Sequence, residues 1–417
     1  MYLTVKQQVK HLSKEQYLCL RELCHVAKNL YNQGIYNVRQ YYFQENKYLN
    51  YEKNYALLKD SENYKVLNSN MSQQILKEVD GAFKAFFGLL KLVKKGKYRS
   101  KDVRLPSYLP TDGFTTLVIQ MFHIKNGYLT VPFSQSYKKM HKAVTIKVPP
   151  VLAGKKVKEI RIIPKQNAKF FEIQYTYKQD CIQRDLDNTQ ALALDLGVDN
   201  LVTGVTSTGK SFIIDGRKLK SVNRQYNKRI AYLKKILDRQ YPGEHRFSKQ
   251  MYAVTKYRND FVNDYMSKAA KRIVDYCVAH NIGNLVVGYN VTFQQNPGLG
   301  KSGNQNFVMI PFGKLREKLS YLCELNGIAY HEQEESYTSK SSFWDKDELP
   351  VYNDDNPKTY TFSGKRIKRG LYKSGNGQLL NADVNGALNI MRKSNVVSLD
   401  ALYARGEVDT PVRIRVA

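Results

Sequence analysis

The chain has 417 residues, of which 66 are lysine or arginine and 37 are aspartate or glutamate, so its formal net charge is +29 at pH 7. We expect neither a membrane protein nor a secreted one, because no stretch approaches the roughly 18 apolar residues of a spanning helix and the N-terminus lacks a signal-like apolar core. Five scattered cysteines without a C-x-x-C pair exclude a disulfide scaffold and a cysteine zinc ribbon, and the excess charge predicts a polyanionic partner.

The first part of the chain predicts one strand followed by helices. Residues 1–9 alternate apolar and polar side chains, which is typical of a strand. From Ser13 the apolar residues take helical spacing, and Ser13 with Gln16 forms the pattern of a capping box. We therefore expect a helical domain over residues 10–95.

Residues 96–182 predict short strands joined by turns, including a hairpin at Asn126-Gly127. Several short strands in succession are typical of a small barrel or sandwich. Because residues 1–9 also resemble a strand, we expect them to complete this barrel. The helical domain is then an insertion within it.

Residues 183–396 predict a different architecture. Three strands in a meander come first, then two long helices, then strands and helices in alternation, with expected bounds of 217–239 and 248–281 for the long helices, 284–289 and 328–332 for the later strands, and 312–326 and 383–394 for the later helices. This order predicts an RNase H-like α/β sheet whose fourth and fifth strands are parallel neighbours. The tail, residues 397–417, has no clear pattern.

The stretch GVTSTGKS, Gly204 to Ser211, matches the P-loop expression. A P-loop needs a helix directly after it, because the helix N-terminus faces the phosphate. An apolar strand follows here instead, so we interpret STGK as a hairpin turn.

Two aspartates suggest a metal-dependent site. Asp195 lies in the apolar strand ALALDLGVDN, where a lone acid is unfavourable unless it pairs with a lysine or binds a metal. Asp383 falls in the first turn of a predicted helix, where capping is an ordinary role. In a basic RNase H-like frame, however, the two together suggest a two-metal phosphodiesterase, with cations about 4 Å apart.

A third group of acids follows the strand 328–332. The stretch GIAYHEQEESYTSK brings Glu332, Glu334 and Glu335 into an otherwise basic chain. They are either a solvated strand end or ligands of a metal.

The motifs LDLGVDNLVT, ESYTSK and NADVNGALNIMRK resemble the RuvC nuclease domain of TnpB, the transposon-encoded RNA-guided nuclease related to type V CRISPR effectors. The resemblance covers most of the chain. It implies a multidomain α+β protein, with a wedge barrel (1–9 and 96–182), recognition helices (10–95) and a RuvC-like nuclease domain (183–396). It also implies Mg²⁺-dependent cleavage of DNA chosen by pairing to a bound RNA, next to a short flanking motif that the protein reads.

The sequence departs from the family at the catalytic glutamate. The family places this residue at the end of the fourth strand, where Gly288 or Tyr289 stands here. We predict a relocation: a glutamate after the fifth strand reaches across the fourth, and Gly288 leaves the path open. The expected catalytic and metal-ligating residues are Asp195, Glu335 and Asp383, with Glu334 as the alternative to Glu335. If both glutamates face solvent, the site is inactive.

A second departure concerns zinc. The family carries paired cysteines between the TS motif and the last aspartate, but here Ser341 and Trp344 stand near the first pair and no cysteine follows residue 323. We expect the insert 336–381 to fold without zinc, and its basic stretch 364–370 to contact phosphate.

The basic residues predict the nucleic-acid contacts. Helix 217–239 carries cations around its whole circumference, which indicates either contact with a nucleic-acid backbone or a solvated face. In the loop 94–108 basic and aromatic residues alternate, as in a nucleic-acid groove. The Gly-rich loop 294–307 is either a lid or an ordinary loop. The expected nucleic-acid contacts are Lys97, Arg99, Arg104, Lys218, Lys220, Arg224, Arg229, Lys365, Arg366, Lys368 and Arg369.

Three functions follow, in decreasing order of support. The first is an RNA-guided DNA endonuclease using Mg²⁺ (or Mn²⁺). The second is a nuclease-dead RNA-guided transcriptional regulator. The third is a DNA-joining transposase or resolvase, for which no second catalytic domain is evident. The expected partners are a transposon-end-derived guide RNA and double-stranded target DNA, with no membrane. We expect a monomer or weak dimer, located in the bacterial cytoplasm and associated with the nucleoid.

Overall fold

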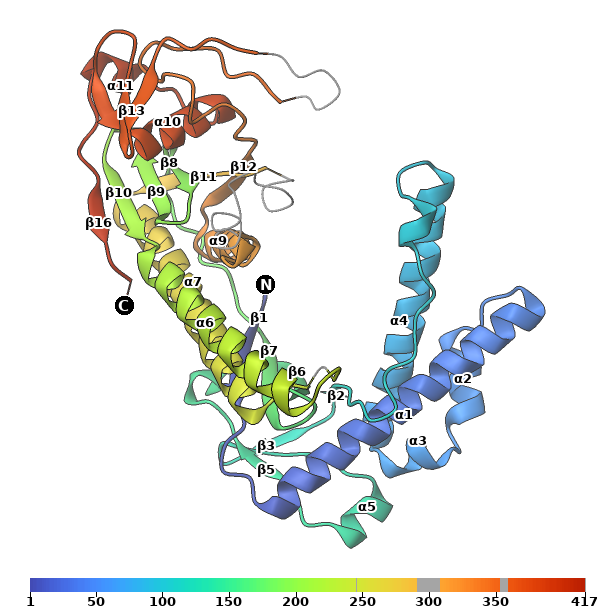
Figure 1. The fold of residues 1–417 in the computed structure, drawn as a ribbon. Helices are drawn as coiled ribbons and strands as arrows, with labels where there is room; N and C mark the ends of the chain where they lie inside the picture. The colour runs from blue at the N-terminus through green and yellow to red at the C-terminus, as the bar shows by residue number, and fades with distance from the viewer. Residues whose placement is uncertain (245, 291–307, 353–358, 417) are drawn as a thin grey trace. The chain divides into compact units, whose positions relative to one another are not determined.

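The structure, a computed structural model, describes residues 1–244, 246–290, 308–352 and 359–416 (Figure 1). The predicted lid or loop at 294–307 lies outside the described residues. The chain divides into two compact units, Met1–Gln179 and Asp180–Ala417.

Four of the α-helices of the first unit follow its first strand directly, and a fifth lies between two later strands. Their bounds are α1 (Lys14–Glu45), α2 (Tyr51–Leu58), α3 (Glu62–Val66), α4 (Ser69–Lys94) and the short α5 (Gln135–Met140). The predicted capping box opens α1: the Ser13 side chain accepts from the Gln16 N–H, and the Gln16 side chain accepts from the Ser13 N–H. Along α1 and α4 the buried apolar side chains share two clusters, so the two long helices pack together.

The strands of the first unit pair as two sheets. One has the order β1-β7-β6-β2 and the other β3-β4-β5, and the bounds are β1 (Tyr2–Gln8), β2 (Leu117–Ile119), β3 (His123–Lys125), β4 (Tyr128–Thr130), β5 (Thr145–Lys147), β6 (Val157–Lys165) and β7 (Phe170–Lys178). β1 pairs along its full length with β7, so the chain's first strand joins strands that are more than 100 residues away. The predicted hairpin turn joins β3 to β4, with φ of 52° at Asn126 and 75° at Gly127.

The second unit contains, within its described residues, a six-stranded sheet with the order β12-β11-β8-β9-β10-β16. Its strands are β8 (Asp187–Leu196), β9 (Asn200–Thr206), β10 (Ser211–Asp215), β11 (Ile282–Gly288), β12 (Ala329–Gln333) and β16 (Val412–Ile414). β8, β9 and β10 form the predicted antiparallel meander. β11 is parallel to both β8 and β12, which confirms the predicted parallel neighbours.

Helices cover both faces of this sheet (Figure 1). The bounds are α6 (Arg217–Gln240), α7 (Lys249–Ala279), α9 (Phe312–Asn326), α10 (Ala382–Ser394) and α11 (Asp400–Arg405). α7 and α9 share one apolar core with the sheet, and α10 shares the other. A small sheet, β13 (Lys365–Lys368), β14 (Leu371–Lys373) and β15 (Leu379–Asn381), directly precedes α10.

The structure also places the P-loop-like stretch and the C-terminal tail. The P-loop-like stretch is the turn between β9 and β10, with Gly209 at φ 90°, so the hairpin interpretation is confirmed. The undefined tail supplies β16, which pairs with β10 at the edge of the sheet. None of the described helices is both long and apolar enough to cross a membrane.

Candidate active site

The alternation of side chains along β8 determines which face of the sheet Asp195 lies on. Leu192, Leu194 and Leu196 pack into the core shared with α7 and α9. Ala191 and Ala193 pack into the opposite core, shared with α10. Successive side chains of a strand point to opposite faces, so Asp195 continues the second series and faces α10.

A glycine on α10 receives the Asp195 carboxylate. A Cβ added at Gly386 would lie 2.9 Å from Asp195 Oδ2, so a side chain there would collide with the carboxylate. Asp195 is closely surrounded by protein atoms, yet its side chain is not fully closed off from solvent. Burial raises its pKa well above the usual value, the charges of Glu335 and Asp383 raise it further, and Arg366 offsets this only in part.

Glu335 reaches the same face from the carboxyl end of β12. A Cβ added at Gly288 would lie 2.7 Å from Glu335 Oε2 and 2.5 Å from Ile390 Cδ1, so the carboxylate occupies space that a side chain at 288 would fill. Gly288 is the last residue of β11, the strand between β12 and β8. The predicted path across the fourth strand is therefore present. Burial, and then the charge of Glu334, raise the pKa of Glu335 to about 7.

The other two glutamates of this stretch are held by cations. Glu334 forms an ion pair with Lys393 at 2.5 Å and accepts from the Ser336 N–H at 2.6 Å. Although burial raises the pKa of Glu334, these hydrogen bonds outweigh it and the net pKa lies below the usual value. Both carboxylate oxygens of Glu332 accept hydrogen bonds from Arg316, at 2.8 Å each. Among the described residues, no such cation pairs with Glu335, whose charge acts on Asp195.

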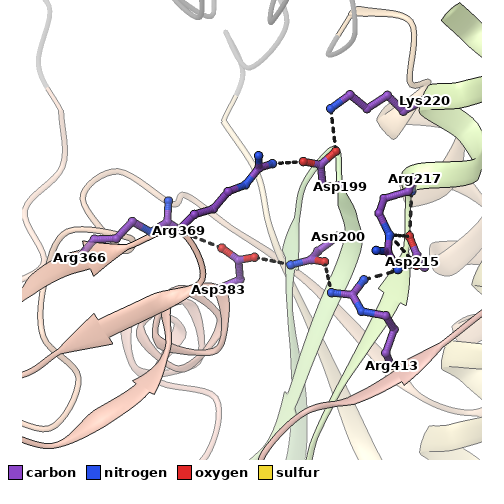
Figure 2. A network of polar contacts seen from close by, with 9 residues as sticks. All are labelled: Asp199, Asn200, Asp215, Arg217, Lys220, Arg366, Arg369, Asp383 and Arg413. Atoms are coloured by element: carbon purple, nitrogen blue, oxygen red, sulfur yellow. Dashed lines mark hydrogen bonds and ion pairs between the residues drawn. The ribbon is translucent and has the colours of Figure 1, made fainter.

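Asp383 lies in the first turn of α10, whose N-cap is Asn381. Its Oδ2 accepts from Asn200 Nδ2 at 2.6 Å, and its Oδ1 accepts from Arg366 Nη2 at 2.8 Å (Figure 2). Capping of α10 is done by the Asn381 side chain, which accepts from the N–H groups of Asp383 and Val384. The carboxylate of Asp383 is therefore not the N-cap, although its place in the first turn still suits the helix dipole.

The fit of these acids to a divalent metal depends on their spacing and on their chemistry. Among the described residues, no three His, Cys, Asp or Glu side chains lie close enough together to hold an ion. The donor chemistry nevertheless fits Mg²⁺, which prefers carboxylate oxygens. Asp195 and Glu335 share one face over two glycines, and burial with like charges disfavours their ionised forms, which a cation would relieve. Asp383 can also serve as a ligand of the metal once Arg366 no longer occupies its Oδ1 atom.

The predicted nucleic-acid residues fall into two groups. Lys220, Arg366 and Arg369 are paired with acids: Lys220 lies 2.9 Å from Asp199, Arg369 also binds Asp199, and Arg366 binds Asp383 (Figure 2). The others are exposed, and they are Lys97, Arg99, Arg104, Lys218, Arg224, Arg229, Lys365 and Lys368. Within this second group Arg99 pairs with Asp102 of the same loop at 2.7 Å.

The insert 336–381 is held together by two aspartates. Asp345 accepts from the N–H groups of Gly375 and Asn376, at 2.6 and 3.1 Å. Asp347 accepts from the N–H groups of Ser342 and Ser363, at 2.8 and 3.0 Å. These bonds tie the start of the insert to its later loops.

The sequence did not single out Asn200, Gly386 or Arg413 as parts of the site. Asn200 and Gly386 stand inside the quoted motifs LDLGVDNLVT and NADVNGALNIMRK, so their place in those motifs was the only signal. Arg413 lies in the tail, where the alternation of VRIRV was a weak sign of a strand.

Comparisons with known proteins identify what this chain is similar to. Residues 173–294 match the OrfB_IS605 family model, described as a probable transposase, and residues 312–390 match the Cas12f1-like TNB domain. The TnpB-like protein ORF457 of Acidianus two-tailed virus is 24% identical, over 90% of this chain and 83% of the viral protein. The cryo-EM structure of a Cas12f1–sgRNA–target DNA complex has a TM-score of 0.58 at 16% identity, covering 91% of this chain and 83% of that one. The chain therefore has the mixed α+β multidomain fold of that structure.

Proposed function

Because this chain is a TnpB-family protein, we propose that it is an RNA-guided DNA endonuclease that cleaves its target by two-metal phosphodiester hydrolysis. The family implies an RNA-guided nuclease, and the residues of this chain support the step to cleavage. We infer a guide RNA derived from the transposon end, a double-stranded DNA target next to a short flanking motif, and a monomer or weak dimer in the bacterial cytoplasm, associated with the nucleoid.

One observation carries the proposal: Asp195 and Glu335 are brought together on one face, over two glycines, where burial and like charge raise the pKa of both. A nucleic-acid-binding surface gains nothing from carboxylates, since they repel phosphate unless a cation neutralises them. Gly386 and Gly288 leave space for the carboxylates of Asp195 and Glu335, which favours a metal-dependent hydrolytic site over a binding surface alone.

Each acid has a role in this proposal. Asp195 and Glu335 hold the cations from the sheet, and Asp383 completes the set from α10. When bound, two Mg²⁺ ions supply activation of the attacking water and stabilisation of the leaving oxygen. We assign Glu335 rather than Glu334, because Lys393 already neutralises Glu334.

The arginines of the small sheet have two successive partners in this proposal. Arg366 now neutralises Asp383, and Arg369 now neutralises Asp199. An arginine binds phosphate as well as carboxylate, because both accept its paired N–H groups. We infer that Arg366 and Arg369 exchange these carboxylates for DNA phosphates, which frees Asp383 Oδ1 for the cation.

The same proposal assigns the remaining domains. Residues 183–396 correspond to a RuvC-like nuclease domain whose insert, 336–381, carries no zinc. β1 and the strands of 96–182 correspond to the wedge barrel, and the helices of 10–95 to the recognition domain. The exposed cations of the loop 94–108 and of α6 supply contacts to the guide or the heteroduplex backbone.

A substitution at Gly288 tests, without removing a charge, whether the space beside the Glu335 carboxylate matters. Gly288→Ala should lower cleavage about 100-fold, because its Cβ would displace the Glu335 carboxylate and a misplacement of about 1 Å costs that much. The backbone of Gly288 accepts alanine and the colliding atoms are side-chain tips, so we expect a free energy of unfolding lowered by only about 1–3 kcal/mol. Cleavage of matched DNA and thermal unfolding measure the two effects.

The control is Gly313→Ala in α9, where an added Cβ would meet no atom within 4 Å. This variant should cleave like the natural chain and be no less stable. Full activity of Gly288→Ala would show that the position of the Glu335 carboxylate does not matter.

Binding of nucleic acid should depend steeply on salt. If 6–10 phosphates are contacted, affinity should fall about 10³- to 10⁵-fold between about 50 and 200 mM salt. Arg224→Ala and Arg229→Ala should each reduce the slope of log K against log salt by about 1, if each contacts one phosphate. Filter binding across a salt series measures this, and a flat response would exclude phosphate recognition.

One experiment tests the function as a whole. The chain is purified from a host that expresses its flanking locus, the co-purified RNA is sequenced, and matched DNA is incubated with the complex and Mg²⁺. We expect cleavage that EDTA abolishes. RNA-dependent binding without cleavage would instead support the nuclease-dead regulator, which the present ion pair of Asp383 with Arg366 favours.

A further inference from the structure

The C-terminal strand carries a side chain into the candidate site. β16 pairs in parallel with β10, with Arg413 opposite Ile213. From there Arg413 Nη2 donates to Asn200 Oδ1 at 2.8 Å, and Nη1 lies 3.6 Å from Asp215 Oδ2 (Figure 2). A segment near residue 413 thus contacts the start of β9, more than 200 residues earlier.

This contact fixes the orientation of the Asn200 amide. A guanidinium only donates, so Asn200 must turn its oxygen toward Arg413. Its NH₂ group is then directed to Asp383 Oδ2, where it donates at 2.6 Å. Without Arg413, the Asn200 oxygen would lose this donor, and the amide would be held from the Asp383 side alone.

Asp215, the other partner of Arg413, is itself held in place. The Asp215 side chain is only 8% exposed. It accepts from the backbone N–H of Arg217 at 2.9 Å and from Arg217 Nε at 3.0 Å. Arg413 is therefore held between a fixed acid and the Asn200 amide.

We propose that Asn200 is a positioning residue for Asp383, and that Arg413 of the C-terminal strand holds it in that role. With Oδ2 bound to Asn200, the carboxylate cannot rotate, and its Oδ1 keeps one direction. Arg366 binds Oδ1 in this structure, and a divalent cation would replace it. The inference rests on the proposed function, since it assumes that Asp383 binds the metal.

The distinction to be tested is between positioning and a purely structural link. Hydrogen bonds to a ligating carboxylate orient it, and their loss costs about 10- to 100-fold in metal affinity. A structural link would instead lower stability and leave metal affinity unchanged in the folded protein. Metal affinity and stability must therefore be measured separately.

The experiment uses the full chain and Mn²⁺ as the probe, with its dissociation constant measured by electron paramagnetic resonance without DNA. Asn200→Ala and Arg413→Ala should weaken Mn²⁺ binding about 10- to 100-fold, and Arg413→Lys should recover part of the loss. Melting temperatures in EDTA should stay close to that of the natural chain for Asn200→Ala. The exposed Arg415→Ala, two residues further along the tail, is the control and should bind Mn²⁺ normally.

A double-mutant cycle gives the sharpest result. If Asn200 acts through Asp383, Asn200→Ala should add no further loss of Mn²⁺ affinity in an Asp383→Ala background. Additive losses, or Mn²⁺ affinity within about twofold of normal in Asn200→Ala, would overturn the proposal.

Cleavage measured against metal concentration separates this inference from the proposed function. Asn200→Ala should need more metal but recover most of its cleavage at saturation. A natural chain that binds Mn²⁺ but cuts no guided target would refute the endonuclease, while the affinities would still decide the role of Asn200. A natural chain that binds no Mn²⁺ would overturn both.

Discussion

Replacing Asp195 by alanine should reduce Mg²⁺-dependent cleavage at least about 1,000-fold, which corresponds to about 4 kcal/mol of transition-state stabilisation. The carboxylate faces α10 from the sheet, and the charges of Glu335 and Asp383 act on it, so in the proposed function these residues would hold the cation. Guide RNA binding should stay nearly intact, because the contacts to RNA come from basic surfaces. Cleavage of matched DNA and filter binding of RNA measure the two effects on one preparation.

The same substitution should not destabilise the metal-free protein. Burial and two neighbouring acids raise the pKa of Asp195, so its ionised form is disfavoured in the folded state at neutral pH. Removing it should leave the melting temperature in EDTA unchanged or raise it, as is common for strained functional sites. Asp187→Asn, at the other end of β8, is the matched control and should cleave normally. Equal loss of cleavage and RNA binding would mean that Asp195 is structural.

Replacing Glu335 by glutamine should have a comparable effect on cleavage. Glutamine keeps the shape and the position over Gly288 but lacks the charge that would hold a cation. We expect a loss of about 100- to 1,000-fold, corresponding to about 3–4 kcal/mol. The measurement is the rate of cleavage of matched DNA at saturating Mg²⁺, with the guide RNA bound.

Glu334→Gln is the control for this prediction. It breaks the ion pair with Lys393, whose side chain is only 9% exposed, so we expect some loss of stability and little loss of cleavage. The reverse pattern, with activity lost in Glu334→Gln and kept in Glu335→Gln, would move the role to Glu334. Normal cleavage by both variants would refute the relocation of the glutamate.

Two aspartates connect distant parts of the insert 336–381. Asp345 and Asp347 accept backbone N–H groups from its later loops, much as ligands would converge on a metal. Burial raises the pKa of Asp345, but bonds from Ser342, Gly375 and Asn376 outweigh it and bring the net pKa below the usual value. The insert thereby carries β13, whose Arg366 reaches the candidate site.

Local patterns of the sequence determined the elements. The Ser13 capping box opens α1, the Asn126-Gly127 turn joins β3 to β4, and an apolar strand after GVTSTGKS excluded a P-loop. These signals are local, because a cap, a two-residue turn or a strand depends on neighbours within a few positions. The same kind of reasoning placed Asp195 on a buried strand, β8, and Glu335 after β12, the strand beyond its parallel neighbour β11.

Only the tertiary structure decided which distant side chain each acid meets. Glu334 and Glu335 are adjacent in sequence, yet one pairs with Lys393 on α10 and the other lies over Gly288 on β11. Likewise, Asp383 meets Asn200 and Arg366, and Arg413 reaches Asn200 from the tail. Such pairs depend on the order of strands in the sheet and on the packing of α10 against it. No periodicity in the sequence encodes them, since hydrophobic patterns fix which face a side chain takes but not which distant side chain it meets there.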